Sequence, residues 1–396
     1  MFSNQLINRF SNLKTPFYFY DTALLQRTLL AIVIAAKRYN YHLHYAVKAN
    51  ANSRILQIIS DFGLGADCVS GNEIKLALEN GFSADKIVFA GVGKTDEELH
   101  LAIDKNIFCV NCESLQELEI LNAIAAMQNK KMRIALRINP DINAQTHKHI
   151  TTGLKYNKFG LSLPDVEYVI KYITKYSYLI IDGLHFHIGS QITNNLVFKD
   201  LCGRVNSFLD IFSQNNICIQ HINLGGGLGI DYSMPESQIS DFQAYFDVFY
   251  QNLKVEPWQK IHFEPGRAVV GQAGVLITRV LYLKENGNRK TIIVDAGFTE
   301  LLRPALYQAT HKITNISSES GEMLYDIAGP LCETADYFGR DVLLPETKRG
   351  DLLVIYSAGA YGEVMASNYN LRPPAGKFFS NDLLESATRE LNACEG

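Results

Sequence analysis

The residues most able to do chemistry lie at the ends of short apolar runs. Lys48 ends the run HYAVK, Asp67 lies within GADCVS, and His187 closes IDGLHFH. A triple glycine at residues 225–227 closes HINLGGG, and Glu264 closes KIHFE. If the runs are parallel strands of one barrel, their carboxyl ends meet at the same rim. We therefore expect an amine, two carboxylates, an imidazole and a glycine loop to share one site.

Each of these features alone has an ordinary structural explanation. A lysine at a strand end is usually a solvated rim residue, and a single histidine more often belongs to a core than to a catalytic site. A triple glycine often marks only a tight turn. Glu264 and Arg267, in EPGR, could form a plain ion pair. All of these explanations would have to hold at once, whereas a single ligand accounts for the whole set.

We expect that ligand to be pyridoxal 5'-phosphate, for the following chemical reasons. A lysine amine can bind an aldehyde covalently, and the backbone N–H groups of a glycine loop can bind a phosphate at a helix start. A carboxylate beside the pyridine nitrogen keeps that nitrogen protonated, so the ring can accept electrons. An imidazole can stack on the face of the ring. We therefore predict that Lys48 holds this cofactor covalently.

A metal site is the alternative from a different chemical class. His185 and His187 form an HxH pair, and strand alternation places both side chains on one face. A metal-dependent hydrolase could use such a pair with a lysine on a barrel rim, but those enzymes tend to carry HxH on the first strand and not on the sixth. Cys109 and Cys112 form a CxxC without the second pair that a structural zinc site usually needs. We expect them to be strand residues and predict no metal.

The elements that must position these residues follow a repeating pattern. Eight runs rich in β-branched and aromatic residues alternate with helical segments such as GNEIKLALENG, which predicts a parallel sheet. Eight such strands within roughly 220 residues predict a TIM (β/α)8 barrel. The runs are HYAVKA, GADCVS, KIVFAG, FCVNCE, RIALRINP, IDGLHFHIG, HINLGGGLG and KIHFEPGR.

A second domain of different character follows the barrel. Two β runs flank Asn286-Gly287, which is a strong hairpin signal, and MLYDIAGP and DLLVIYSAGAYG are further strands. TPFYFYD, near the start of the chain, could add a strand to the same sheet. We predict a cofactor-binding barrel at residues 24–270 and a mostly antiparallel, sandwich-like β domain from residues 1–23 plus 271–396. The long polar connection at residues 139–160 is expected to be functional.

Composition excludes several classes of function. The chain has 396 residues with 37 basic and 41 acidic side chains, a net charge of −4, which predicts no nucleic-acid or polybasic membrane surface. No apolar run reaches the roughly 18 residues of a transmembrane helix, and the first residues lack the apolar core of a signal peptide. Seven cysteines, an odd number spread along the chain, indicate reduced thiols in a cytoplasm.

Several motifs occur in the order and spacing of one known family. The sequence resembles the fold-type III pyridoxal phosphate decarboxylases nearly from end to end, and within them the diaminopimelate decarboxylases most closely. The motifs that carry this resemblance are HYAVKAN, GADCVSGNE, THKHITTGLKYNKFG, HFHIGSQ, INLGGGLGI, EPGR, GPLCETAD and GAYG.

The resemblance implies a role for each matching residue around the cofactor. Lys48 would bind the cofactor covalently, Asp67 would lie near that lysine and influence its charge, and His187 would stack on the ring. Glu264 would contact the pyridine nitrogen. The glycines would bind the phosphate through their N–H groups. The remaining cofactor-binding residues that the resemblance implies are Ser190, Gly225, Gly226, Gly227, Gly266, Arg267 and Tyr361.

The resemblance also implies substrate contacts and a homodimer with shared sites. Cys332 and Glu333 would come from the neighbouring subunit, the first as proton donor and the second as ligand of the substrate ammonium group. The other substrate contacts would be Arg267, Arg303, Tyr307 and Tyr361. Catalysis would therefore depend on Lys48 and Cys332.

The implied reaction is decarboxylation of meso-2,6-diaminopimelate to L-lysine and CO2, the last step of lysine biosynthesis. The distal amino-acid centre of that substrate needs cations and an anion, which two arginines and Glu333 supply, and arginine offers a planar fork for a carboxylate. Ornithine decarboxylases typically have Asp where this chain has Glu333. An ornithine, arginine or carboxynorspermidine decarboxylase, an amino-acid racemase and a non-catalytic cofactor-binding protein remain alternatives.

Overall fold

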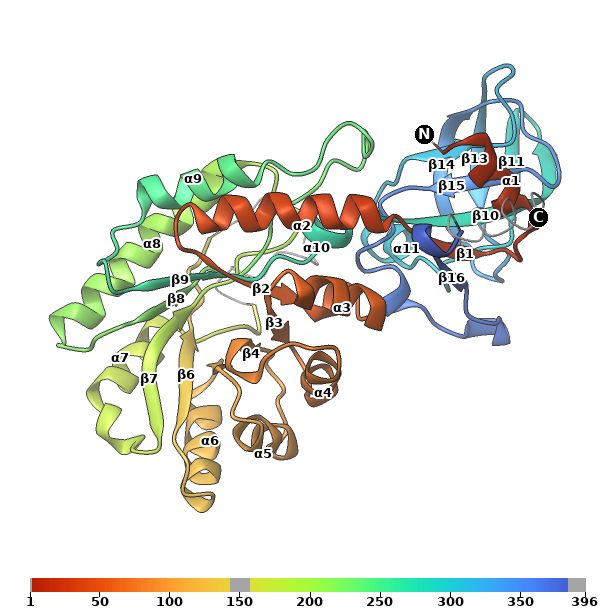
Figure 1. Cartoon of the computed structure of the whole chain (residues 1–396). Coiled ribbons are helices and arrows are strands. Elements are labelled where there is room, and N and C mark those ends of the chain that lie inside the picture. Colours follow the sequence, from red (N-terminus) through yellow and green to blue (C-terminus); the bar gives the residue numbers. More distant parts are fainter. Residues whose placement is uncertain (1, 143–156, 384–396) are drawn as a thin grey trace, which may run out of the picture. The chain divides into compact units, whose positions relative to one another are not determined.

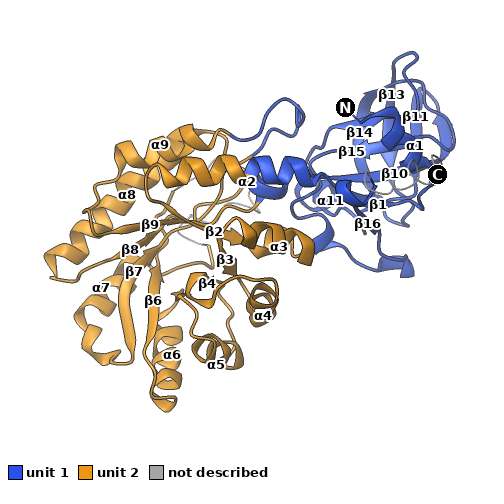
Figure 2. Cartoon of the chain, in the orientation of Figure 1, with its two compact units in different colours: residues 1–28, 230–240, 267–396 blue, residues 29–229, 241–266 orange. Residues whose placement is uncertain are grey.

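The computed structural model describes residues 2–142 and 157–383, which form two compact units (Figure 1; Figure 2). We call residues 29–229 and 241–266 the barrel unit, and residues 1–28, 230–240 and 267–396 the β unit. The barrel domain expected at residues 24–270 also included residues 24–28, 230–240 and 267–270, which here are grouped with the β unit. Most of the predicted functional connection at 139–160 lies outside the described residues.

The barrel unit contains a closed ring of eight parallel strands. Each of the eight predicted runs provides one strand, and the last pairs with the first through His42 opposite His262. The TIM-barrel prediction is therefore confirmed, with strands that are shorter than the apolar runs. The strands are β2 (His42–Ala46), β3 (Gly65–Cys68), β4 (Ile87–Phe89), β5 (Cys109–Cys112), β6 (Met132–Arg137), β7 (Leu179–His185), β8 (His221–Asn223) and β9 (Lys260–Phe263).

Helices alternate with these strands around the barrel (Figure 1). Three of them begin with a Ser or Thr followed three residues later by Glu, and in each the hydroxyl accepts a bond from the backbone N–H of that Glu. These caps fix the residue at which each of the three helices begins. The helices are α2 (Thr22–Lys37), α3 (Ser53–Asp61), α4 (Gly71–Glu79), α5 (Asp96–Asp104), α6 (Leu115–Met127), α7 (Leu163–Lys171), α8 (Asn195–Gln214) and α9 (Phe242–Asn252).

A row of hydrogen-bonded histidines lies toward the amino ends of strands β2, β8 and β9. His44 Nδ1 lies 2.9 Å from the carbonyl oxygen of Lys86, and His44 Nε2 lies 2.9 Å from His262 Nδ1. His262 Nε2 lies 3.0 Å from His221 Nδ1. Burial is the main cause that lowers the pKa of both His44 and His221 to about 4. The charges of Arg133 and Lys260 add to the effect at His221, whereas the hydrogen bond to the Lys86 carbonyl acts in the opposite direction at His44. These rings are therefore neutral in the folded protein near pH 7.

This row predicts that the fold loses stability in mild acid. The unfolded chain takes up a proton at each histidine near pH 6.5, whereas the folded row resists until about pH 4, so stability falls as pH falls between these values. A shift of that size corresponds to about 3 kcal/mol for a single buried ring such as His44. Denaturant unfolding of wild type and His44→Asn at pH 7 and pH 4.5 measures it. A variant with the same pH dependence as wild type would contradict the assignment.

The β unit contains an eight-stranded, mostly antiparallel sheet. The predicted hairpin is confirmed, with Asn286 paired to Arg289 and Gly287 at φ +60° in the turn. The early strand β1 pairs antiparallel with β10, as expected. The strands are β1 (Phe17–Tyr20), β10 (Gly274–Asn286), β11 (Arg289–Val294), β12 (Ile313–Asn315), β13 (Met323–Ala328), β14 (Tyr337–Leu344), β15 (Leu352–Ile355) and β16 (Gly376–Phe379).

Short helices and an aromatic core complete the β unit. Helix α1 (Asn4–Asn12) packs Phe10 against Phe17 and Phe19 of β1. Helices α10 (Arg267–Val270) and α11 (Arg303–Tyr307) each begin with an arginine. Within the described part of the chain, no helix combines the length and apolar character needed to cross a membrane.

Candidate active site

Lys48 and Asp67 form an ion pair at the carboxyl end of the barrel strands. Strand β2 ends at Ala46, and a short 3₁₀ turn (Val47–Ala49) then carries Lys48, so this lysine lies just beyond the strand that was expected to end with it. Lys48 Nζ donates to Asp67 Oδ2 at 2.7 Å. The side chain of Asp67 is fully buried, whereas that of Lys48 is 36% exposed. The amine is therefore held in place and is accessible to a ligand.

The pKa of Asp67 is raised to about 6. Burial is the main cause and the charge of Glu264 adds to it, while Lys48 acts in the opposite direction. Asp67 Oδ1 is buried without a hydrogen-bond partner among the described residues. This carboxylate is costly to keep charged unless a cation or a ligand stays beside it, which suits a residue that controls the charge of Lys48.

Glu264 accepts hydrogen bonds from the ends of three other barrel strands. His185, the last residue of β7, lies with Nε2 3.1 Å from Glu264 Oε2. Asn223, the last residue of β8, donates to Oε1 at 2.7 Å, and Asn111 of β5 donates to the same oxygen at 3.4 Å. Burial favours the neutral acid, but the interactions with His185 and Lys48 outweigh it and lower the pKa of Glu264 below its usual range.

The glycine loop follows β8 directly and packs closely against the next strand end. A Cβ on Gly226 would lie 2.2 Å from the carbonyl oxygen of Glu264, so no other residue fits there. Gly225 N–H donates to Asn223 Oδ1 at 2.9 Å, and Gly226 N–H donates to His187 Nδ1 at 3.2 Å. Among the described residues, the N–H of Gly227 donates to no backbone carbonyl. It is therefore the glycine donor most open to a phosphate.

His187 lies just beyond the end of β7 beside this loop. Burial is the main cause that lowers its pKa to about 3, and the charges of Arg137 and Lys48 contribute. Because Nδ1 accepts from Gly226, the proton of the neutral ring is on Nε2. A neutral imidazole in a fixed orientation can stack on a flat ring. Ser190, in the turn that follows, is partly buried.

The β unit contains a separate cluster of two arginines around one tyrosine. Arg267 Nη1 donates to the Tyr232 hydroxyl at 2.6 Å, and the Arg303 guanidinium lies 4.5 Å from the centre of the same ring. The Arg267 guanidinium also lies 4.9 Å from the ring centre of Tyr361. Both arginines are almost fully buried. Two buried cations are thus held around one phenol, an arrangement that would suit an anion.

His311 fixes the second of these arginines. Arg303 Nη1 donates to His311 Nε2 at 2.7 Å, and His311 Nδ1 donates to the carbonyl oxygen of Tyr356 at 2.7 Å. Burial is the main cause that lowers the pKa of His311 to about 3, and the charge of Arg303 adds to it. Burial also lowers the pKa of Arg303, to about 10, so this arginine keeps its charge at neutral pH. Tyr307, the last residue of α11, is partly buried.

The loop between β13 and β14 carries Cys332 and Glu333, and both side chains are exposed. Asp336 anchors the loop because its two carboxylate oxygens accept from the backbone N–H groups of Phe298 and Leu331, at 2.7 and 2.8 Å. Glu333 accepts from the Tyr369 hydroxyl at 2.6 Å. A thiol and a carboxylate are thus presented to solvent on an anchored loop.

Several contributors were missed because no sequence motif distinguishes them. The sequence suggests His185 only as half of a metal pair, whereas its ring faces Glu264 and that of His187 faces the glycine loop. Asn223 and Asn111 look like ordinary strand residues. Polar residues at the ends of otherwise apolar strands were the available signal for all three, since a buried polar group needs a partner. Tyr232 and His311 lie in loops without such a signal.

Comparison with known proteins places the chain in a family. Residues 26–271 match the family model described as "Pyridoxal-dependent decarboxylase, pyridoxal binding domain". The chain is 52% identical over 380 residues to a diaminopimelate decarboxylase of Bacteroides thetaiotaomicron, covering 96% of this chain and 98% of that protein.

The chain belongs to the pyridoxal-dependent decarboxylases.

Other members support the same assignment. A diaminopimelate decarboxylase of Aquifex aeolicus is 41% identical, with 92% of this chain and 86% of that protein covered. The crystal structure of diaminopimelate decarboxylase from Helicobacter pylori complexed with L-lysine matches with a TM-score of 0.89 and 36% identity, covering 97% of this chain and 99% of that one. The expected family is confirmed, and membership decides against the metal-dependent hydrolase.

The residues of the barrel unit fit the cofactor of this family. Lys48 offers an accessible amine, and Glu264 offers a buried carboxylate. Gly227 offers a backbone N–H, and the neighbouring backbone is so close that only glycine fits at this position. Asp67 and His185 each keep one buried polar atom without a partner among the described residues. Such orphaned atoms at the strand rim are expected where a polar ligand completes the site.

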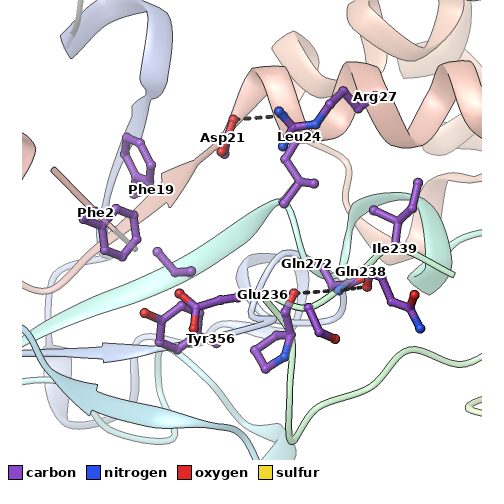
Figure 3. A pocket seen from close by; sticks show the side chains of 14 residues that line it. Phe2, Phe19, Asp21, Leu24, Arg27, Glu236, Gln238, Ile239, Gln272 and Tyr356 are labelled. Carbon is purple, nitrogen blue, oxygen red and sulfur yellow. Dashed lines mark hydrogen bonds between the residues drawn. The ribbon is translucent and has the colours of Figure 1, made fainter.

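A cavity of about 500 Å³ in the β unit contains none of the predicted site residues (Figure 3). Its lining includes Phe2, Phe19, Arg27, Glu236 and Tyr356. In the lining of this cavity, the side-chain amide of Gln272 (Figure 3) donates to the carbonyl oxygens of Pro235 and Gln238. The two bonds are 2.7 and 2.9 Å long. These bonds hold the segment 230–240, which contains Tyr232 of the arginine cluster.

Proposed function

We propose that this protein converts meso-2,6-diaminopimelate to L-lysine and CO2 with pyridoxal 5'-phosphate, in the cytoplasm and as a homodimer. The observation that carries the proposal is the 52% identity to a diaminopimelate decarboxylase over nearly the whole of both chains. A cytoplasmic location is supported by the described cysteines, all of which are free thiols.

The proposed roles in the barrel unit follow from its geometry. When bound, pyridoxal phosphate supplies a pyridinium ring that accepts the electron pair left behind when CO2 departs. Lys48 would hold the cofactor covalently, and Asp67, 2.7 Å from the amine, would set the charge of that amine. Glu264 would keep the ring nitrogen protonated, and His187 would stack on the ring. Gly227, with Ser190 and Gly266, would bind the phosphate.

The arginine cluster would bind the substrate. Diaminopimelate has a second carboxylate at its far end, and a guanidinium fork suits that group. Arg303 and Arg267 are buried, charged and fixed by Tyr232 and His311, so they are preorganised for an anion. Tyr307 and Tyr361 belong to the same proposed substrate contacts. A substrate that ends in an amine alone would leave these cations without an anion, which argues against ornithine.

The exposed Cys332 and Glu333 would complete the site of a neighbouring subunit. Cys332 Sγ would return a proton to the α-carbon, and Glu333 would bind the distal ammonium group. A thiol and a carboxylate that face solvent on an anchored loop are suited to such an exchange between subunits.

Replacing Cys332 by alanine is expected to lower kcat about 10²- to 10⁴-fold, the range for loss of a positioned proton donor. Cofactor content should stay at one per chain, because Cys332 would not hold the cofactor of its own chain. Steady-state kinetics and cofactor absorbance measure both quantities. Wild-type turnover in Cys332→Ala would remove the assignment, and Cys332→Ser, which keeps a weaker donor, should fall between the two.

A mixing experiment tests the shared sites. Lys48→Ala and Cys332→Ala chains, each nearly inactive alone, would form dimers in which one of the two sites has both intact residues. Random exchange should then restore about one quarter of wild-type activity. Absence of any recovery, despite subunit exchange shown by a tagged chain, would rule out sites shared between subunits.

The substrate is tested by direct assay of cofactor-supplemented protein. We expect L-lysine to form from meso-diaminopimelate, and ornithine, arginine and carboxynorspermidine to be poor substrates by comparison. Product identification by mass spectrometry separates L-lysine from putrescine and agmatine. Consumption of ornithine or arginine in preference to diaminopimelate would overturn the proposed substrate while leaving the family membership intact.

A further inference from the structure

His185 is a fully buried histidine with one ring nitrogen in a hydrogen bond and the other without a partner among the described residues. The residue is 1% exposed, and its Nε2 lies 3.1 Å from Glu264 Oε2. Its Nδ1 is buried and has no hydrogen-bond partner among the described residues. Since a carboxylate oxygen can only accept, the proton between them is on Nε2 of the imidazole.

The unpartnered Nδ1 shows which nitrogen of this ring provides the proton of the bond. A proton on Nδ1 would create a buried N–H group with no acceptor, which is costly. The geometry therefore places the donated proton on Nε2, facing Glu264 Oε2. This bond orients Glu264 and stabilises its charged form, and that charge can interact with another cation.

The hydrogen bonds to Glu264 are divided unequally between its two oxygens. Oε1 accepts from Asn223 and Asn111, whereas His185 is the donor to Oε2 within the described residues. Loss of either asparagine would leave Oε1 with another donor. Loss of His185 would leave Oε2 with none, and the buried carboxylate would then more readily take up a proton.

The other charged and titratable groups around the pair belong to the same rim. Asp67 and Lys48 lie near enough to interact electrostatically with Glu264 or His185, and so does His187. Asp67 is negative and would favour protonation of Glu264, while Lys48 opposes it. His187 Nδ1 accepts from the N–H of Gly226, so this nitrogen does not donate to Glu264. Within the described residues, His185 is the donor that Glu264 Oε2 uses.

We propose that His185 is a positioning residue that keeps Glu264 an oriented carboxylate, and that Glu264 thereby keeps the ring nitrogen of the bound cofactor protonated. The inference rests on the proposed role of Glu264 in the cofactor site. It also explains the HxH pair without a metal. His185 bonds to Glu264 through Nε2, whereas His187 accepts from Gly226 through Nδ1.

Two substitutions of similar size separate a hydrogen-bonding role from a packing role. In His185→Gln the amide nitrogen can occupy the position of Nε2, whereas in His185→Asn the shorter side chain places it near that of Nδ1. We expect Asn to lower kcat about 10- to 100-fold, the range for loss of a supporting hydrogen bond, with KM little changed. Gln should restore most of the turnover. His221→Gln, at the other end of the barrel, is a matched control for replacing a buried histidine.

The pH dependence provides a readout that a packing role would not change. In His185→Asn the acid limb of kcat/KM should move upward by one pH unit or more, and the visible absorbance of the bound cofactor should titrate in the same range. His185→Gln and His221→Gln should follow wild type in both measurements. Equal impairment of Asn and Gln without a shift of either profile, or a wild-type profile in Asn, would overturn the proposal.

Failure of the proposed function would look different. In that case the wild-type protein itself would not bind pyridoxal phosphate or form L-lysine. Wild type that binds the cofactor and turns over, with a normal His185→Asn variant, would refute only the role of His185. If His185→Asn does not fold, a His185→Gln variant with a shifted acid limb would equally contradict the proposal.

Discussion

Replacing Lys48 by alanine is expected to abolish the covalent attachment of pyridoxal phosphate and to lower kcat more than about 1,000-fold, the scale of losing a covalent catalytic group. The reason is geometric. Lys48 Nζ is fixed by Asp67 at 2.7 Å on a rim where its side chain remains 36% exposed, so an aldehyde can reach it. Borohydride reduction followed by mass spectrometry of the peptide that contains residue 48 measures the attachment directly.

Lys48→Arg is the matched control for this experiment. It keeps a cation beside Asp67 but provides no amine that can be deprotonated for the attachment. We expect the folded protein to be as stable as wild type, with no label trapped by borohydride. A trapped label on either variant, or an unchanged visible absorbance, would show that a different residue holds the cofactor.

Replacing Glu264 by glutamine is expected to lower kcat about 10²- to 10³-fold, the range for removing one electrostatic contact to a developing charge. A neutral amide cannot keep the ring nitrogen protonated. Its NH2 group would also face the N–H donors of His185 or Asn223, which now bond to carboxylate oxygens. Kinetics, together with a pH titration of the cofactor absorbance, measures the two consequences.

Glu264→Asp distinguishes charge from position. Aspartate keeps the negative charge but withdraws it by one methylene, so turnover should exceed that of the glutamine variant while staying below wild type. Cofactor content should stay near one per chain in both, because Lys48 is intact. A glutamine variant with wild-type kcat would refute the proposed role of Glu264.

The sequence was sufficient for the barrel because its eight apolar runs alternate with helices, and alternation is a local signal. The Asn286-Gly287 hairpin was equally local. The boundaries were less certain. Lys48 and His187 follow their strands and do not end them, since strand length depends on pairing with neighbours. Segment 230–240 reads as a barrel loop, yet Gln272 bonds to its backbone in the β unit.

Site residues that belong to a sequence motif could be predicted. The residues that hold these site residues in place could not. His185 and Asn223 became visible only when the ends of β7, β8 and β9 met. His311 lies eight residues from Arg303 in the sequence and accepts a hydrogen bond from it. His311 is itself held by the backbone carbonyl of Tyr356, a contact that no sequence pattern specifies. Such networks depend on tertiary contacts between side chains that are individually unremarkable in sequence.

The hydrogen bonds of the histidine row, toward the amino ends of the barrel strands, all run in the same direction. Because the Lys86 carbonyl can only accept, His44 donates to it from Nδ1, His262 donates to His44, and His221 donates to His262, each from Nδ1. All three rings must therefore be the same tautomer, and no ring can switch without the others. Only His221 has an Nε2 outside the row, so the first proton taken up in acid enters there, and nitrogen-15 chemical shifts of the three rings would reveal that order.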